Sequence, residues 1–371
     1  MRISSTLCVI FAILLASASA WAESWCASPI FVHEWGVHTF GQCSTELGEQ
    51  AKCPIDTKLP SYFHREGPAV NDVSRHVKDE PVDTGEREIP VIQVYSKGGW
   101  SDRIPLAVEL GFANGQAQVW YPQVDARLAN DEPIELVWSQ LSGSETPLKP
   151  APDTELDWIL GLRKVPDALW LNHKDETERF IFYEGDSQES AALRLRKGEQ
   201  YSPEKRHLLI ENTSDADVED VFLSFRGDGH SFLFFAPKIP AKSSAGFILE
   251  EHELSNDDWA KSSRSQLRKR LLEPLALDAI DPWTNCIMGR DPAQPYSISS
   301  GYRLYSEELE VLLALWAERF FDSQGYTLLY RESTAYVDQQ VPLRVYTDMY
   351  YYVVLSRLSL ALMENVLISE Q

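Results

Sequence analysis

Three residues near the N-terminal end have side chains that bind metals or transfer protons. His33, Glu34 and His38 place two imidazoles and a carboxylate within one short segment of the 371-residue chain. These groups are ligands for Zn²⁺ and other divalent transition metals, and His33 or Glu34 is also suited to general-base catalysis. The segment therefore predicts Glu34 and His33 as candidate catalytic residues, and all three residues as candidate metal ligands.

The spacing of these residues also supports a plainer interpretation. A zincin site needs histidines four residues apart on a helix, whereas His33 and His38 are five apart with Gly36 between them. On a strand the two histidines point to opposite faces, and only a bend at Gly36 brings them together. The spacing favours a first strand with Phe31 and Trp35 in the core and its polar side chains hydrogen-bonded locally.

Other catalytic motifs are missing from the sequence. It contains no Gly-x-Ser-x-Gly turn of the kind that exposes a nucleophilic serine, and no Gly-rich phosphate-binding loop. An enzyme of these classes is therefore not indicated, and the question of catalysis stays with the His33 segment.

The N-terminal residues predict that the chain is exported. A basic residue at Arg2, an apolar run over Leu7–Leu15 and small residues ending at Ala22 form the pattern of a cleaved signal peptide. Residues 1–22 are therefore predicted to be removed, and we expect a periplasmic or extracellular protein. No integral membrane segment is expected after cleavage, because charged residues interrupt the apolar run near the C-terminus.

Four cysteines remain in the predicted mature chain, namely Cys26, Cys43, Cys53 and Cys286. An even number in an oxidising compartment predicts two disulfides, and three pairings are possible. We favour Cys43 with Cys53, which closes a short loop, and Cys26 with Cys286. A zinc site made of the four cysteines is the alternative, although no Cys-x-x-Cys pair is present.

The charge balance excludes some partners. The chain has 34 basic and 56 acidic side chains and a net charge of -22. Nucleic acid needs a basic surface, and anionic membranes repel an acidic one, so neither is an expected partner. A carbohydrate, a small molecule or a protein remains possible as the ligand, and the oligomeric state is not indicated.

The pattern of apolar residues predicts an α+β fold. Residues 23–255 read as a β-rich region that forms an antiparallel β-sandwich, with an immunoglobulin-like part over 205–253. Residues 256–371 read as a helix-rich C-terminal region packed on it, with helices over Asp257–Leu272, 306–323 and Thr347–Leu367 and a strand over Tyr326–Arg331. The expected strands of the β-rich region are Val91–Tyr95, Pro105–Phe112, Ala117–Tyr121, Ile134–Gln140, Arg179–Tyr183, Ala192–Arg196, His207–Glu211, Val218–Phe225, Ser231–Phe235 and Ala245–Glu250.

A family resemblance begins in the same N-terminal segment. His33-Glu-Trp-Gly36 resembles the His-Glu-Trp-Gly-Thr-Phe-Thr motif near the mature N-terminus of a family of uncharacterised exported bacterial proteins. The resemblance implies an exported protein of one recurring architecture and supplies no catalytic residues. His38 lies outside the family pattern, which weakens a two-histidine metal site. Shorter similar stretches follow in order, and they are Pro90-Val91-Ile92 with Tyr95-Ser96, Trp120-Tyr121-Pro122, Arg179 to Tyr183 with Gly185, Trp316 with Phe320-Phe321, Leu328-Leu329-Tyr330 after Gly325, and Asp338 before Pro342-Leu343.

Two functional hypotheses follow from the sequence. The favoured one is an exported binding or assembly protein of unknown ligand, because no complete catalytic motif is present. The alternative is a metal-dependent hydrolase or metal-binding protein that uses His33 and Glu34, with His38 and a residue from 60–80 as further ligands. Its cofactor would be a divalent metal such as Zn²⁺.

Overall fold

The computed structural model describes residues 28–40, 59–65, 85–96, 103–128, 134–199, 201–202, 205–227, 229–271, 297–348 and 351–369. The predicted signal peptide and the four cysteines of the predicted disulfides, Cys26, Cys43, Cys53 and Cys286, lie outside the described residues. All statements about the fold refer to the described residues.

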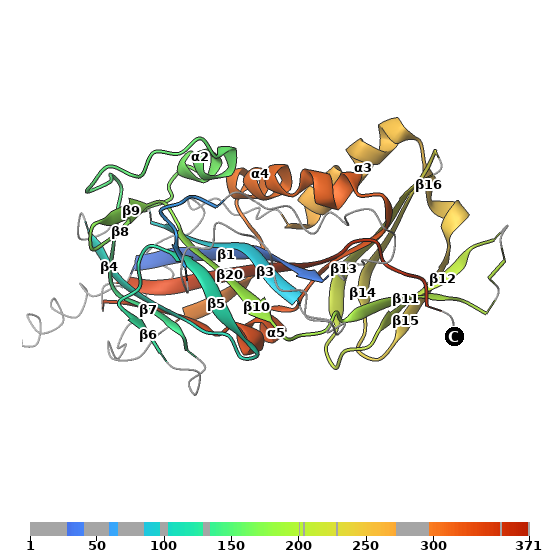
Figure 1. Ribbon diagram of the computed structural model, residues 1–371, viewed down its shortest axis with the longest axis horizontal. Coiled ribbons are helices and arrows are strands. Elements are labelled where there is room, and N and C mark those ends of the chain that lie inside the picture. The colour runs from blue at the N-terminus through green and yellow to red at the C-terminus, as the bar shows by residue number, and fades with distance from the viewer. Residues whose placement is uncertain are drawn as a thin grey trace, which may run out of the picture.

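The largest element is a mixed sheet of eleven strands. These are β1 (Ser28–Phe40), β2 (His64–Arg65), β3 (Gly85–Tyr95), β5 (Gly115–Tyr121), β10 (Ile181–Ser187), β13 (Val218–Gly227), β14 (His230–Ile239), β16 (Glu253–Leu254), β17 (Ser297–Gly301), β18 (Gly325–Arg331) and β20 (Tyr351–Met363). Ten of them follow the order β16-β14-β13-β18-β20-β1-β3-β10-β5-β2, and β17 pairs with β20. Strands β1 and β20 lie side by side at the centre of this sheet and run parallel (Figure 1).

Two smaller sheets accompany the large one. Six strands form the first, β4 (Ile104–Leu110), β6 (Ala126–Arg127), β7 (Leu136–Ser144), β8 (Trp170–His173), β9 (Glu176–Glu178) and β19 (Leu343–Thr347). Three strands form the second, β11 (Leu193–Lys197), β12 (His207–Asn212) and β15 (Ser244–Ile248), in the order β11-β12-β15. The two sheets lie at opposite ends of the molecule (Figure 1).

The helices are few and short. Helices α2 (Asp157–Arg163), α3 (Asn256–Leu271) and α4 (Ser306–Leu315) lie along one side of the large sheet, and α5 (Thr334–Gln340) lies on the other (Figure 1). A 3-10 turn covers Leu249–His252 and a π-helical turn covers Glu318–Asp322. None of the described helices has the length and apolar character needed to cross a membrane.

Both faces of the central strands are buried by separate apolar cores. On the helix side, Trp35 of β1 and Leu360 of β20 pack with residues of α2, α3 and α4. On the other side, Val32 and Val353 pack with residues of the six-stranded sheet. A third core joins the three-stranded sheet to β13, β14 and β18. Any polar side chain on β1 or β20 is therefore placed in an interior from which water is excluded.

The predicted fold class is wrong. An antiparallel, immunoglobulin-like sandwich followed by a helical C-terminal region does not describe a chain with three sheets, one of them mixed and open. Residues 256–371 contain β17, β18, β19 and β20, and β20 occupies the predicted helix Thr347–Leu367. A strand covered on both faces is apolar at nearly every position, so its pattern resembles that of a buried helix.

Two of the C-terminal predictions are confirmed and one is confirmed in part. Helix α3 matches the predicted helix Asp257–Leu272, and β18 matches the predicted strand Tyr326–Arg331. The predicted helix over 306–323 is divided into α4 and the π-helical turn that follows it.

Candidate functional site

The predicted site residues on β1 are buried on opposite faces of the strand. His33, Glu34 and His38 are 3%, 3% and 0% exposed. Glu34 and His38 lie on the face of Val32, and His33 lies on the helix-side face with Trp35, as strand alternation predicts. Burying a polar group without a partner costs free energy, so each of the three must find one inside the protein.

His33 pairs with a helix and not with a metal-binding cluster. Its Nδ1 donates to Glu308 Oε2 of α4 over 2.6 Å, and its ring packs in one cluster with those of Tyr95 and Tyr305. The same Glu308 oxygen accepts the backbone N–H of Tyr305, over 3.0 Å, at the start of α4. His33 therefore fastens the helix to the central sheet.

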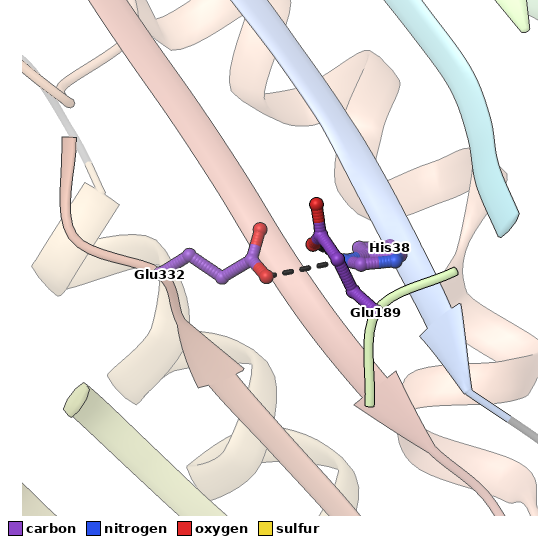
Figure 2. Close-up of side chains that lie close together, drawn as sticks. All are labelled: His38, Glu189 and Glu332. Carbon is purple, nitrogen blue, oxygen red and sulfur yellow. Dashed lines mark hydrogen bonds and ion pairs between the residues drawn. The ribbon is translucent and has the colours of Figure 1, made fainter. Parts of the chain in front are cut away.

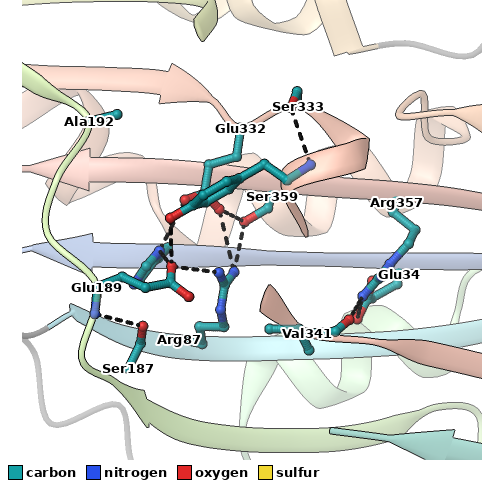
Figure 3. Close-up of polar contacts among 12 residues, drawn as sticks. Glu34, Arg87, Ser187, Glu189, Ala192, Glu332, Ser333, Val341, Arg357 and Ser359 are labelled. Atoms are coloured by element: carbon teal, nitrogen blue, oxygen red, sulfur yellow. Dashed lines mark hydrogen bonds and ion pairs between the residues drawn. The ribbon is translucent and has the colours of Figure 1, made fainter. Parts of the chain in front are cut away.

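Glu34 forms a buried ion pair with Arg357 of β20 (Figure 3). The two residues are register partners in the parallel β1–β20 pair. Arg357 Nε donates to Glu34 Oε2, and Arg357 Nη2 donates to Oε1 over 3.0 Å. The Tyr183 hydroxyl of β10 donates to the same Oε1 over 2.5 Å. Both oxygens of Glu34 are thus occupied by protein donors.

The charges of this pair and their burial shift the pKa values of Arg357 and Tyr183. Burial alone lowers the pKa of Arg357, but the adjacent Glu34 carboxylate outweighs that effect and raises it. Burial and the Glu34 charge both raise the pKa of the Tyr183 hydroxyl well above its usual value. At neutral pH Arg357 therefore keeps its charge and the Tyr183 hydroxyl keeps its proton.

A pocket of about 420 Å³ opens beside Arg357. Arg357 Nη1 donates over 2.7 Å to Asp338 of α5, whose side chain is 54% exposed. Arg344 of β19 also lines the pocket, and its side chain is 50% exposed. The remaining lining residues are Thr334, Pro342, Leu343 and Leu355.

Gly36 allows the chains around Glu34 to approach closely. A Cβ atom at this position would lie 3.0 Å from both Cα and Cβ of Pro90 on β3. The register of β1 against β3 also shifts between Trp35 and Val37. A larger residue would therefore push β1 and β3 apart next to the Glu34–Arg357 pair.

His38 lies in a different cluster, with Glu189 and Glu332 (Figure 2). Its Nδ1 donates to Glu332 Oε1 over 3.1 Å and lies 3.8 Å from Glu189 Oε2. Glu332 follows β18 and Glu189 follows β10, and the two residues are 6% and 9% exposed. His38 Nε2 is buried and has no hydrogen-bond partner among the described residues.

Three further side chains hold these carboxylates (Figure 3). Arg87 of β3 donates from Nη1 to Glu332 and from Nη2 to Glu189, each over 3.4 Å. The Ser359 hydroxyl donates to Glu332 Oε2 over 2.5 Å, and the Tyr336 hydroxyl donates to Glu189 Oε2 over 3.1 Å.

Burial and the neighbouring charges lower the pKa values of His38 and Glu332 and raise that of Arg87. Burial and the Arg87 charge lower the pKa of His38, which keeps the imidazole neutral. Burial alone raises the pKa of Glu332, but Arg87, His38 and Ser359 outweigh it and lower the value to about 2. Burial lowers the pKa of Arg87, and the two carboxylates reverse this and raise it.

A small void separates the two clusters on this face. Its volume is about 10 Å³, roughly one water molecule, and its lining includes Glu34, Arg87, Tyr183 and Ser359. The Glu34–Arg357 pair and the His38 cluster therefore lie next to each other in the interior.

The structure separates the predicted His33, Glu34 and His38 into three settings. Only His38 lies in a group of ligand-type side chains, and its partners there, Glu189 and Glu332, are residues that sequence reasoning missed. Of the region 60–80, His64 is described, and its Nε2 pairs with Glu176 over 2.7 Å, away from all three. The sequence did contain one signal of a buried pair, because Arg357 interrupts an otherwise apolar segment.

The fold and the site define a β-rich protein with paired charges buried in its central sheet. No family model matches the chain, and no curated protein matches its sequence. The Fcho1 Mu homology domain of Danio rerio with bound Eps15 peptide is similar at a TM-score of 0.34 and 7% identity, over 92% of this chain and 97% of that one. The yeast delta-COP-I mu-homology domain complexed with a Dsl1 WxWxV peptide reaches 0.29 and 8%, over 92% and 98%. Both TM-scores are too low to carry an argument about fold or function.

Proposed function

We propose that the chain is an exported binding protein and that the pocket beside Arg357 takes up a short segment of a protein or peptide ligand. One observation carries this proposal. The pocket, of about 420 Å³, combines two half-exposed side chains of opposite charge with apolar ones. Binding pockets of this size are mostly apolar, with a few polar groups that orient the ligand.

The lining of the pocket matches the chemistry of a peptide. Asp338 can accept a cationic group and Arg344 an anionic one, while Leu343 and Pro342 can cover an apolar side chain. The Thr334 hydroxyl offers a further hydrogen bond. A polypeptide segment presents all of these groups within the length of a few residues, which a purely apolar or a singly charged small molecule does not.

The surroundings of Glu34 favour binding over hydrolysis. A general base must come within hydrogen-bonding distance of the proton that it removes. Glu34 is not among the pocket-lining residues, and both of its oxygens already accept hydrogen bonds from Arg357 and Tyr183. The alternative of a hydrolase that uses His33 and Glu34 therefore gains no support from this geometry.

The tryptophans do not favour a carbohydrate ligand. Sugar-binding sites present exposed aromatic faces, and six of the described tryptophans are buried instead. Trp170 is partly exposed, but the guanidinium of Arg179 lies over its ring, 5.1 Å from the centroid. The buried ones are Trp35, Trp120, Trp138, Trp158, Trp259 and Trp316.

Two features of the sequence complete the proposal. Export is supported by the signal-peptide pattern of residues 1–22. The stretches that resemble the exported bacterial family contribute Asp338, Pro342 and Leu343 to the pocket lining. They also contribute Glu34, which pairs with the lining residue Arg357, and Tyr183, which donates to Glu34. The resemblance and the export remain part of the proposal.

A peptide selection tests the proposed pocket. A phage library of random heptapeptides is selected on the immobilised protein, and the enriched peptides are then measured by fluorescence polarisation. Leu343→Trp fills the pocket and should weaken binding at least tenfold. Leu367→Trp is the matched control, because Leu367 is 83% exposed and lies outside the pocket. Equal binding by both variants, or no enriched peptide, contradicts the proposal.

A further inference from the structure

We propose that His38, Glu189 and Glu332 bind one divalent transition-metal cation such as Zn²⁺. The ligands are His38 Nδ1 and one carboxylate oxygen from each glutamate. This site is distinct from the pocket beside Arg357 and does not depend on the peptide-binding proposal.

The ligand atoms are spaced as a metal requires. All three lie within 4.8 Å of one another, and Nδ1 lies 3.1 Å from Glu332 and 3.8 Å from Glu189. Ligands held about 2.1 Å from a tetrahedral ion are about 3.4 Å apart, between these two distances. An ion can therefore take the place of the Nδ1 proton, which moves to Nε2 of the neutral imidazole, with little movement of the backbone.

The charges of the cluster also favour a cation. Two carboxylates face one guanidinium, that of Arg87, and a neutral imidazole adds no charge to them. The described side chains of the cluster thus carry one uncompensated negative charge in a closed interior. A neutral imidazole is also the form that binds metals.

The hydrogen bonds to Glu332 match those of an outer coordination shell. Metal-binding carboxylates are usually held by further hydrogen bonds, which orient them. Here the Ser359 hydroxyl and Arg87 contact Glu332 Oε2, which leaves Oε1 directed at His38. Arg87 is also the group that opposes a cation, and its contacts are long, at 3.4 Å.

The other described histidine–carboxylate contacts lack the third ligand. These single pairs are His33 with Glu308, His64 with Glu176, His173 with Asp125, and His230 with Glu253. Among the described residues, the group of three at His38 is the one with metal-ligand spacing. The part-exposed His64 pair therefore provides a matched control.

The test is metal analysis of the full chain, produced in medium with added Zn²⁺ and purified without chelator. We expect about one equivalent of metal by mass spectrometry in the unmodified protein and in the control His64→Gln. His38→Gln and Glu189→Gln should each retain less than a tenth of that amount, with circular dichroism spectra that show folding.

Two outcomes overturn the proposal. The first is an unmodified protein without bound metal that also shows no rise in melting temperature when unfolded and refolded with Zn²⁺ or Co²⁺. The second is full metal retention by folded His38→Gln, which would place the ion elsewhere, for example on the cysteines.

Replacing the opposing cation, as Arg87→Gln, should instead raise the metal affinity at least tenfold.

Discussion

The buried pair of Glu34 and Arg357 provides a sharp test of how the central sheet is held together. Glu34→Gln keeps the shape of the side chain and removes its charge, whereas Arg357→Met removes the guanidinium and keeps much of its apolar length. Both side chains are nearly inaccessible, at 4% and 1% exposure. Each single substitution therefore leaves a charged partner inside the protein.

The expected losses of stability differ between the two variants, because the charged residue that remains keeps different hydrogen-bond partners in each. Breaking a buried ion pair by removing one member costs about 3–5 kcal/mol. After Glu34→Gln, Arg357 still contacts Asp338 and the Val341 carbonyl, so we expect a loss near the lower value, about 3 kcal/mol. After Arg357→Met, Glu34 retains only the Tyr183 hydroxyl among its described side-chain donors, so we expect about 4–5 kcal/mol.

Urea unfolding followed by tryptophan fluorescence and by circular dichroism measures these losses. The double variant should be more stable than the sum of the single losses predicts, by about 2–3 kcal/mol, because neither charge is then left unpaired. Arg344→Met is the control, since this arginine is half-exposed and its ion pair with Glu109 is long, at 3.6 Å, so its loss should cost less than about 1 kcal/mol. Additive single losses, or equal losses for Arg357→Met and Arg344→Met, would refute the reasoning.

Two further predictions concern other parts of the fold. Burial alone raises the pKa of Asp125, but hydrogen bonds from the Ser139 hydroxyl and amide outweigh it and lower the value from 3.8 to about 2. Asp125 thus contributes about 2 kcal/mol to the free energy of unfolding, and this contribution is present above pH 3.8 and lost as the pH falls through 2. Asp125→Asn should therefore flatten this part of the stability–pH curve measured by urea unfolding. Gly115→Ala places a Cβ 2.0 Å from the Asp186 carbonyl oxygen and should lower the free energy of unfolding, measured in urea, by about 1–3 kcal/mol. At Gly229 nothing lies within 4 Å of such a Cβ, so Gly229→Ala should cost only the strain of the positive φ, about 1 kcal/mol. A Gly115→Ala variant as stable as the unmodified protein would show that β5 and β10 are not packed as described.

The pattern of apolar residues located elements better than it identified their type. The charged helix α3 could be predicted, because it has one exposed and one buried face. The short strand β18 was also predicted, although its last five residues are all buried. Strand β20 could not be predicted, because the cores on both of its sides require apolar residues at consecutive positions. Its polar interruptions are Ser356, Arg357 and Ser359, and the last two are two residues apart, which is the strand period. That spacing was the available signal that the segment is a strand.

The candidate site could be found only in part for a different reason. His38 was recognisable as a ligand-type residue, but its partners Glu189 and Glu332 lie 151 and 294 positions away, and no spacing rule connects them. Their meeting depends on the order of strands in the large sheet, which places β1 between β20 and β3. Polar residues that meet across the centre of a sheet are therefore the hardest to predict from a single sequence.

The same order of strands gives the buried charges a role in specifying the fold. Buried ion pairs often add little stability compared with apolar residues, yet they penalise any arrangement that separates them. Strands β1 and β20 are apolar on both faces, so hydrophobic packing alone distinguishes weakly between neighbouring registers. A shift of one residue would turn Arg357 to the helix-side face, among residues such as Trp35 and Leu360, and would leave Glu34 unpaired. The Glu34–Arg357 pair thus excludes the slipped registers and, through Asp338, sets the position of α5 and of the pocket beside it.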